Sequence, residues 1–156
     1  MNIELYFKNI NNSPECNVTA NGTSLYAGPV REKISINSTT LGEIFLQIAF
    51  TNKQPTDTVV DSSGTIVSDK NFELDKIIID NYNIEELIWN SEYVADHGDV
   101  YSSCLFFGPP GKFTIKLENP VLPWILRTRH ERNGDDPNWQ EDYNYYDTAC
   151  KLLAQI

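Results

Sequence analysis

Hydrophobic and polar residues alternate most regularly in the segment 43–80. Ile44, Leu46, Ile48 and Phe50 alternate there with residues of the opposite face. This period of two is typical of a strand with one buried face. A loop rich in Asn, Asp and Ser follows, and the apolar run 72–79 predicts a second strand. The segment therefore predicts two core strands joined by an oxygen-rich loop.

The same pattern predicts further strands on both sides of this segment. They cover residues 3–9, 16–20, 23–26, 30–37, 103–107 and 112–118. Asn21-Gly22 joins two of them and indicates a hairpin, because a type I′ turn needs positive φ at both central residues. Inside the oxygen-rich loop, 58–60 and 65–67 predict a small hairpin of their own.

Residues after 83 are predicted to include segments that are not strands, and the last third of the chain changes character. Residues 84–89 predict one or two helical turns, and residues 90–100 predict a polar loop. The apolar run Val121–Leu126 contains Pro123 and predicts a buried edge or bend. Residues 127–136 then predict a charged loop.

A helix is expected to end the chain. Asp136 is a suitable N-cap, and Pro137 suits the first helical position. One face of this helix would carry Trp139, Tyr143, Tyr146, Cys150 and Leu153, at spacings typical of an α-helix. The helix either covers an end of the core or docks on a partner through Trp139, Tyr143 and Tyr146.

These elements predict an all-β fold, a β-sandwich of jelly-roll type with a C-terminal α-helix. A chain of 156 residues suits one domain. We expect the sandwich in residues 1–126, with the charged loop and the amphipathic helix of residues 127–156 packed on it.

Composition restricts the partners of the domain. The formal net charge of −10 argues against binding to nucleic acid or to an anionic membrane surface. Cys16, Cys104 and Cys150 lie far apart without CxxC spacing, so free thiols are expected. The N-terminus lacks the pattern of a signal peptide, and no apolar run approaches the length of a membrane span. The expected place of synthesis is a reducing cytoplasm.

The loop between the two core strands offers hard oxygen ligands. Asn52, Asp57, Asp61 and Asp69 are candidate calcium ligands together with backbone carbonyls. Their spacing does not match an EF-hand loop. The alternative is that these residues make turns through hydrogen bonds between side chain and backbone.

Two sets of positions carry a resemblance to a known family. The first set is Leu46, Ile48, Phe50 and Asn52, then Asp69, Lys70, Asn71 and Phe72, and then Ile77, Ile79 and Asp80. It resembles small jelly-roll modules of the calcium-dependent xylan-binding kind. The second set, Gly111, Phe113, Ile115, Leu117 and Pro120, resembles the closing strands of such modules encoded by tailed phages.

The resemblance implies that the chain has a jelly-roll fold, binds calcium and serves as a virion accessory protein. Lys53 departs from it, because the calcium-binding family has an acidic residue after the Asn. Lys70 stands where the family has Arg. A lysine beside the supposed metal loop weakens the calcium prediction more than the fold prediction.

Aromatic residues beside polar loops are candidate sugar platforms, and Trp89 and Tyr93 are the best two. A catalytic site is not indicated. His97 and His130 lie near acids, but no Ser or Cys has the G-x-S-x-G context of a nucleophile.

The sequence thus predicts a non-enzymatic, virion-associated structural protein of a tailed phage, either a capsid decoration or a tail module. It would be located in the virion and bind other virion proteins in a symmetric assembly. The alternative function is a calcium-dependent carbohydrate-binding module whose partner is a glycan.

Overall fold

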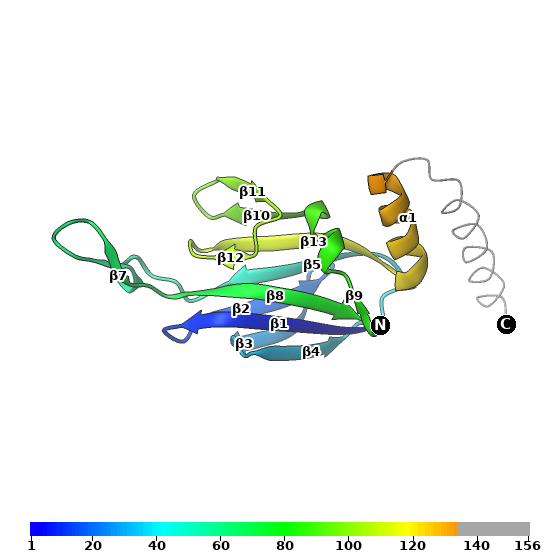
Figure 1. Cartoon of the computed structure of the whole chain (residues 1–156). Coiled ribbons are helices and arrows are strands. Elements are labelled where there is room, and N and C mark those ends of the chain that lie inside the picture. The colour runs from blue at the N-terminus through cyan, green and yellow to red at the C-terminus, as the bar shows by residue number, and fades with distance from the viewer. Residues whose placement is uncertain (134–156) are drawn as a thin grey trace.

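The computed structural model describes residues 1–133, which form two antiparallel sheets packed face to face, a projecting hairpin and a helix (Figure 1). The elements are β1 (Asn2–Asn11), β2 (Glu15–Ala20), β3 (Thr23–Pro29), β4 (Lys33–Asn37), β5 (Gly42–Phe50), η1 (Pro55–Asp57), β6 (Val59–Val60), β7 (Ile66–Ser68), β8 (Asn71–Ile79), β9 (Tyr82–Asn83), η2 (Glu85–Asn90), β10 (Ser91–Ala95), β11 (Val100–Ser102), β12 (Phe106–Phe107), β13 (Gly111–Asn119) and α1 (Val121–Asn133).

The two sheets confirm the predicted fold class. One sheet has the order β12-β8-β1-β4, with β9 added to β8, and the other has the order β11-β10-β13-β5-β2-β3. Neighbouring strands are antiparallel throughout both sheets. The first sheet is called sheet A below and the second sheet B.

The predicted alternation places one face of each long strand in the core. On β5, Ile44, Leu46, Ile48 and Phe50 are buried. On β8 the alternation slips once, because the pairing of β1 with β8 shifts register between Tyr6 and Phe7. This irregularity lets Leu74 and Ile77 both face the core although they are three residues apart.

An aromatic cluster fills the core at one end of the sandwich. Phe72 of β8 stacks on Phe107 of β12, with ring centroids 4.4 Å apart. Phe50 and Tyr93 meet these two rings edge to face. The cluster therefore joins sheet A to sheet B through rings that are buried on all sides.

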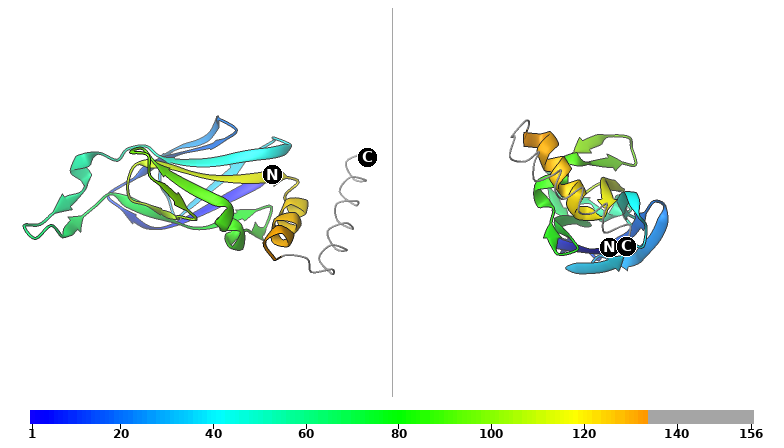
Figure 2. Two further views of the ribbon diagram at one scale, coloured as in Figure 1. Left: turned by 90° about the horizontal axis from the view of Figure 1, so that it is seen from above. Right: turned by 90° about the vertical axis from the view of Figure 1, so that its right-hand side faces the viewer.

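The chain crosses between the sheets at this same end. It passes from β5 in sheet B to β8 in sheet A through residues 51–70, and from β12 back to β13 through residues 108–110. Within the first crossing, β6 and β7 form a two-stranded hairpin, called the arm. Figures 1 and 2 show the arm projecting well beyond the sandwich, with α1 at the opposite end.

The helix α1 replaces the predicted bend at 121–126 and the first part of the charged loop expected over 127–136. Val121, Trp124, Ile125 and Thr128 are buried at the spacing of one helical face. Pro123 is compatible with the helix because it lies in the first turn, where the N–H groups have no intrahelical partner. Ion pairs of Arg127 with Glu118 and of Arg129 with Glu86 hold α1 against the sandwich.

The polar loop predicted over 90–100 is also wrong, because β10 and β11 form a hairpin there. Ser91, Tyr93 and Ala95 are buried, whereas Glu92 and Val94 are exposed. This short strand pairs with the long strand β13. The neighbouring strand supplies the pairing that local composition did not indicate.

Several predictions concern thiols, membrane contact or the last residues of the chain. Cys16 is a buried free thiol whose pKa burial raises to about 12, and Cys104 is a half-buried free thiol between β11 and β12. No helix within residues 1–133 is long and apolar enough to cross a membrane. The helix predicted after residue 136, with Trp139, Tyr143 and Tyr146, lies outside the described residues.

Two adjacent phenylalanines test the role of the aromatic cluster. Phe107 is fully buried in it, whereas Phe106 points outward and is 46% exposed. We expect Phe107→Ala to lower the free energy of unfolding by about 3 to 5 kcal/mol, because a large cavity forms between the sheets. The matched control, Phe106→Ala, should cost less than about 1 kcal/mol. Urea unfolding followed by fluorescence measures both, and equal losses would contradict this account of the core.

Candidate functional site

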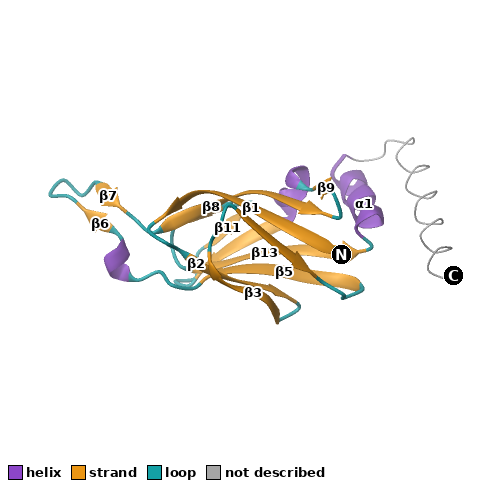
Figure 3. Cartoon of the chain, turned by 90° about the horizontal axis from the view of Figure 1, so that it is seen from below, coloured by secondary structure: helices purple, strands orange, loops and turns teal. Residues whose placement is uncertain are grey.

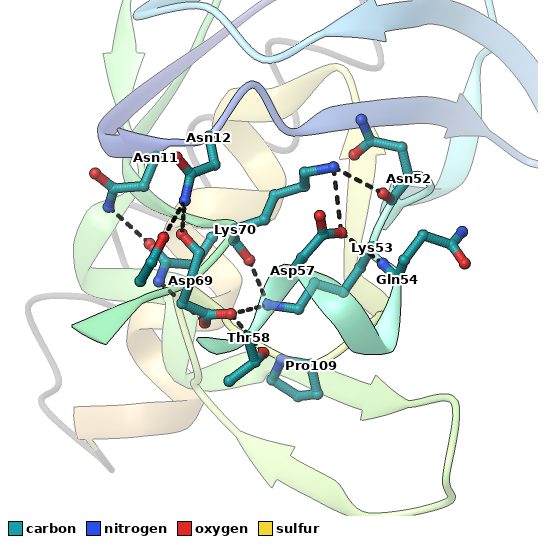
Figure 4. A network of polar contacts seen from close by, with 12 residues as sticks. Asn11, Asn12, Asn52, Lys53, Gln54, Asp57, Thr58, Asp69, Lys70 and Pro109 are labelled. Atoms are coloured by element: carbon teal, nitrogen blue, oxygen red, sulfur yellow. Dashed lines mark hydrogen bonds and ion pairs between the residues drawn. The ribbon is translucent and has the colours of Figure 1, made fainter. Parts of the chain in front are cut away.

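Two lysines close the base of the arm by reaching across it in opposite directions (Figure 4). Lys53 follows β5, and its ammonium group pairs with the carboxylate of Asp69 and donates to the carbonyl of Lys70 at 2.7 Å. Lys70 lies just before β8, and its ammonium group contacts Asp57 Oδ2 at 3.2 Å and the carbonyl of Asn52 at 3.2 Å. Each lysine therefore ties one end of the crossing to the other.

The two carboxylates have further donors. Asp69 accepts hydrogen bonds from Thr58 Oγ1 at 2.7 Å and from Asn71 Nδ2 at 3.2 Å. Burial would raise the pKa of Asp69, but the hydrogen bonds from Lys53, Thr58 and Asn71 outweigh burial and hold the pKa below its usual value. The backbone N–H of Gln54 and then Lys70 lower the pKa of Asp57 in the same way.

Asparagines attach this network to the neighbouring loops. Asn52 accepts from the backbone N–H of Glu15 at 2.8 Å and donates to the carbonyl of Ser13 at 3.1 Å. Asn12 donates to the carbonyl of Asp69 at 2.7 Å. The base of the arm is thereby bound to the β1–β2 connection as well as to both sheets.

The predicted calcium ligands do not converge on one point. Asn52, Asp57 and Asp69 lie close together, but their oxygens bind the two lysines and backbone N–H groups. Asp61 lies in the turn of the arm, where it accepts hydrogen bonds from Ser63 and Thr65. Within residues 1–133, no group of three or more His, Cys, Asp or Glu is placed to hold a metal ion. The arrangement present does not fit a calcium site, and the turn-forming alternative describes Asp61.

A cleft of about 450 Å³ opens beside this network. The residues that line it include Lys53, Gln54, Thr58, Phe106, Pro109 and Pro110. It thus lies between the two crossings of the chain, and we call it the Phe106 cleft. Gly108 lets the ring of Phe106 lie close to the backbone, because a Cβ at Gly108 would meet Phe106 Cε1 at 2.5 Å.

The two predicted sugar platforms have different surroundings. Trp89 is 42% exposed on η2 and lines a second hollow of about 320 Å³ together with Phe45. Tyr93 is fully buried, which raises the pKa of its hydroxyl, and that hydroxyl donates to the carbonyl of Pro109 at 2.6 Å. Its ring therefore offers no face to a ligand. Instead, Tyr93 supports the loop 108–110 from inside.

The exposed ring in the cleft beside the lysine network is Phe106, which is not among the sugar platforms predicted from the sequence. In a strand, adjacent residues face opposite sides, so one of Phe106 and Phe107 had to point outward. The Gly-Pro-Pro-Gly turn that follows was a further sign of an exposed loop. The sequence did not show which of the two rings is outside.

Comparisons with known proteins give information on the fold. No protein-family model matches the chain, and no curated protein matches it. A solved selenomethionine form of vCBM60, from work on two families of calcium-dependent carbohydrate-binding modules linked by circular permutation, has a TM-score of 0.51 and 13% identity. That similarity covers 73% of this chain and 88% of the other.

A structure of vCBM60 in complex with galactobiose is also similar, with a TM-score of 0.48 and 14% identity. Here 74% of this chain and 97% of the other are covered. The selenomethionine structure supports the β-sandwich fold. It carries no information on the residues of the site at this level of identity.

The lowered pKa values of Asp57 and Asp69 predict acid sensitivity. Because both pKa values lie below the ordinary 3.8, the folded state binds fewer protons than the unfolded state as pH falls toward and below that value. The stabilisation is complete above 3.8 and is lost as pH falls through the folded pKa values. Asp69→Asn should therefore flatten the decline of unfolding free energy between about pH 5 and about pH 2.

Urea unfolding at a series of pH values measures this effect. Asp99→Asn is the matched control, because Asp99 is 66% exposed and lies away from the two lysines in the β10–β11 turn. An Asp69→Asn profile that declines as steeply as the wild-type profile would show that the lysine pairing is not what stabilises the ionised carboxylate.

Proposed function

We propose that this protein is a non-catalytic binding module that holds a neutral oligosaccharide in the Phe106 cleft. The observation that carries the proposal is an exposed aromatic ring in a cleft whose rim has amide, hydroxyl and carboxylate groups. The cleft volume of about 450 Å³ suits a small ligand.

A sugar ring matches this combination of groups. It has an apolar face of C–H groups and an edge of hydroxyl groups. The face would pack on the ring of Phe106 and on Pro109, which removes apolar surface from water on both sides. The hydroxyl groups would bond to the exposed amide of Gln54 and to the rim formed by Thr58 and Asp69.

The charges of the site favour a neutral ligand. Lys53 and Lys70 balance Asp57 and Asp69, so the wall of the cleft carries no excess charge. The chain as a whole carries −10, which would repel a phosphate-rich or acidic polymer. The fold similarity to a carbohydrate-binding module supports the same choice of ligand class.

The test compares two aromatic residues in two hollows. Galactobiose and a panel of other neutral oligosaccharides serve as probes, with binding measured by calorimetry. Phe106→Ala should weaken binding at least about tenfold, because the loss of one aromatic contact is worth more than about 1.4 kcal/mol. Trp89→Ala is the matched control and should leave the affinity unchanged. The opposite result would move the site to the hollow beside Trp89, and no binding across the panel would refute the proposal.

The exposed aliphatic residues of the arm favour a second candidate function, which is the structural role in a virion predicted from the sequence. Val59, Val60, Ile66 and Val67 are between 47% and 61% exposed on a two-stranded hairpin. A hairpin of this kind is marginally stable alone in water, and exposed aliphatic patches mark contact surfaces. An arm that packs on a neighbouring copy would suit a symmetric assembly of a capsid or tail.

Self-association tests this second candidate. We expect wild-type protein to form oligomers in sedimentation equilibrium, and the variant Val60→Ser/Ile66→Ser to form fewer, because both changed side chains are exposed on the arm. The variant Val94→Ser/Val100→Ser changes another exposed valine pair, on β10 and β11, and should associate like the wild type. A wild-type protein that remains monomeric at all concentrations would argue against this role for the arm.

A further inference from the structure

We propose that the ammonium groups of Lys53 and Lys70 take the place of a divalent cation at the base of the arm, so that the crossing 51–70 folds without metal. The structural neighbour comes from work on calcium-dependent modules, and the base of the arm in this chain has oxygen groups of the kind that calcium accepts.

Four oxygen-bearing groups lie at the base of the arm, two of them around each lysine Nζ atom. They are the carbonyls of Asn52 and Lys70 and the carboxylates of Asp57 and Asp69. Carboxylate and backbone carbonyl oxygens are both types of ligand that calcium accepts. In this protein all four contact a lysine Nζ atom.

The charge of the two lysines equals the charge of one calcium ion. Lys53 and Lys70 together supply two positive charges, and Asp57 and Asp69 supply two negative charges. These side chains are only 7% to 22% exposed, so water screens the four charges poorly. Two ammonium groups would repel a calcium ion that entered the same space. The oxygens already accept hydrogen bonds from these groups, so few of their lone pairs would be free to bind the ion.

The reciprocal geometry distinguishes these lysines from others in the described residues. Lys53 adjoins Asn52 and reaches Asp69, whereas Lys70 adjoins Asp69 and reaches back to Asp57 and Asn52. Lys33, by contrast, pairs with Glu4 across two strands and is 45% exposed. Lys33 belongs to a solvated surface pair, and it therefore serves as a matched control.

The consequence is an arm base that does not depend on calcium concentration. A bound ion leaves when the free ion is removed, but a lysine is attached to the chain. The wall of the Phe106 cleft that Lys53 and Asp69 form should then keep its shape in a chelator. This inference is independent of sugar binding, and its readouts are calcium binding and thermal unfolding.

The first test uses the wild-type protein. We expect the same Tm in EDTA and in calcium, and no saturable calcium binding by calorimetry up to about 10 mM, which exceeds the range of weak extracellular calcium sites. A Tm that rises with calcium concentration, or a saturable heat of calcium binding, overturns the proposal, because a ligand of the folded state must stabilise it.

The second test removes the two ammonium groups and keeps the oxygens. Lys53→Met/Lys70→Met leaves both carboxylates without a cation, so its Tm in EDTA should be lower than that of the wild type and should rise with calcium. If the variant is unfolded in EDTA, recovery of its circular dichroism spectrum by calcium gives the same support. Lys33→Met should show no response to calcium. A double variant that responds to calcium no more than Lys33→Met overturns the idea that the lysines occupy a cation position.

Discussion

The arm end of this protein depends on the crossed pairing of two lysines with two carboxylates. The chain leaves sheet B after Phe50 and returns in sheet A at Asn71, and the ends of this crossing carry Asp57 and Asp69. Two poorly hydrated carboxylates in one region would repel each other and resist burial. The ammonium groups neutralise both carboxylates, which reduces their repulsion and makes their burial less costly. Because each lysine reaches the opposite end of the crossing, the two lysines also fix where the arm begins.

The remaining features of this end follow from that closure and from the aromatic cluster beneath it. Phe72 and Phe107 of sheet A pack on Phe50 and Tyr93 of sheet B next to the two crossings. Tyr93 also holds the loop 108–110 through the carbonyl of Pro109. The two crossings are thereby held at a separation that leaves a cleft between them. Figure 3 shows the arm extending from this end beyond the strands. A rigid base and a buried aromatic support are what a preformed ligand site needs.

Polar and apolar functions are separated along the crossing. Its base is a closed network of charges and amides, whereas the arm carries exposed aliphatic residues that have no core to join. The oxygen-rich composition of residues 52–69 suggested one metal-binding loop. In the folded chain, this segment consists of a hairpin turn that Asp61 stabilises and a base in which lysines pair with carboxylates. The side-chain oxygens accept hydrogen bonds from N–H and O–H groups of the chain itself, so they do not need an ion as a partner.

Local pattern was sufficient for the long strands and the sandwich, because alternation with a period of two shows which face of a strand is buried. Tertiary structure alone decided three other features. β10 forms because β13 pairs with it, and Phe106 faces outward because Phe107 fills the core. The helix α1 forms because one of its faces, with Val121 and Trp124, is buried against the sandwich. The partners of Lys53 and Lys70 were equally hidden. Contacts across 16 to 18 residues depend on how the two sheets bring the ends of the crossing together.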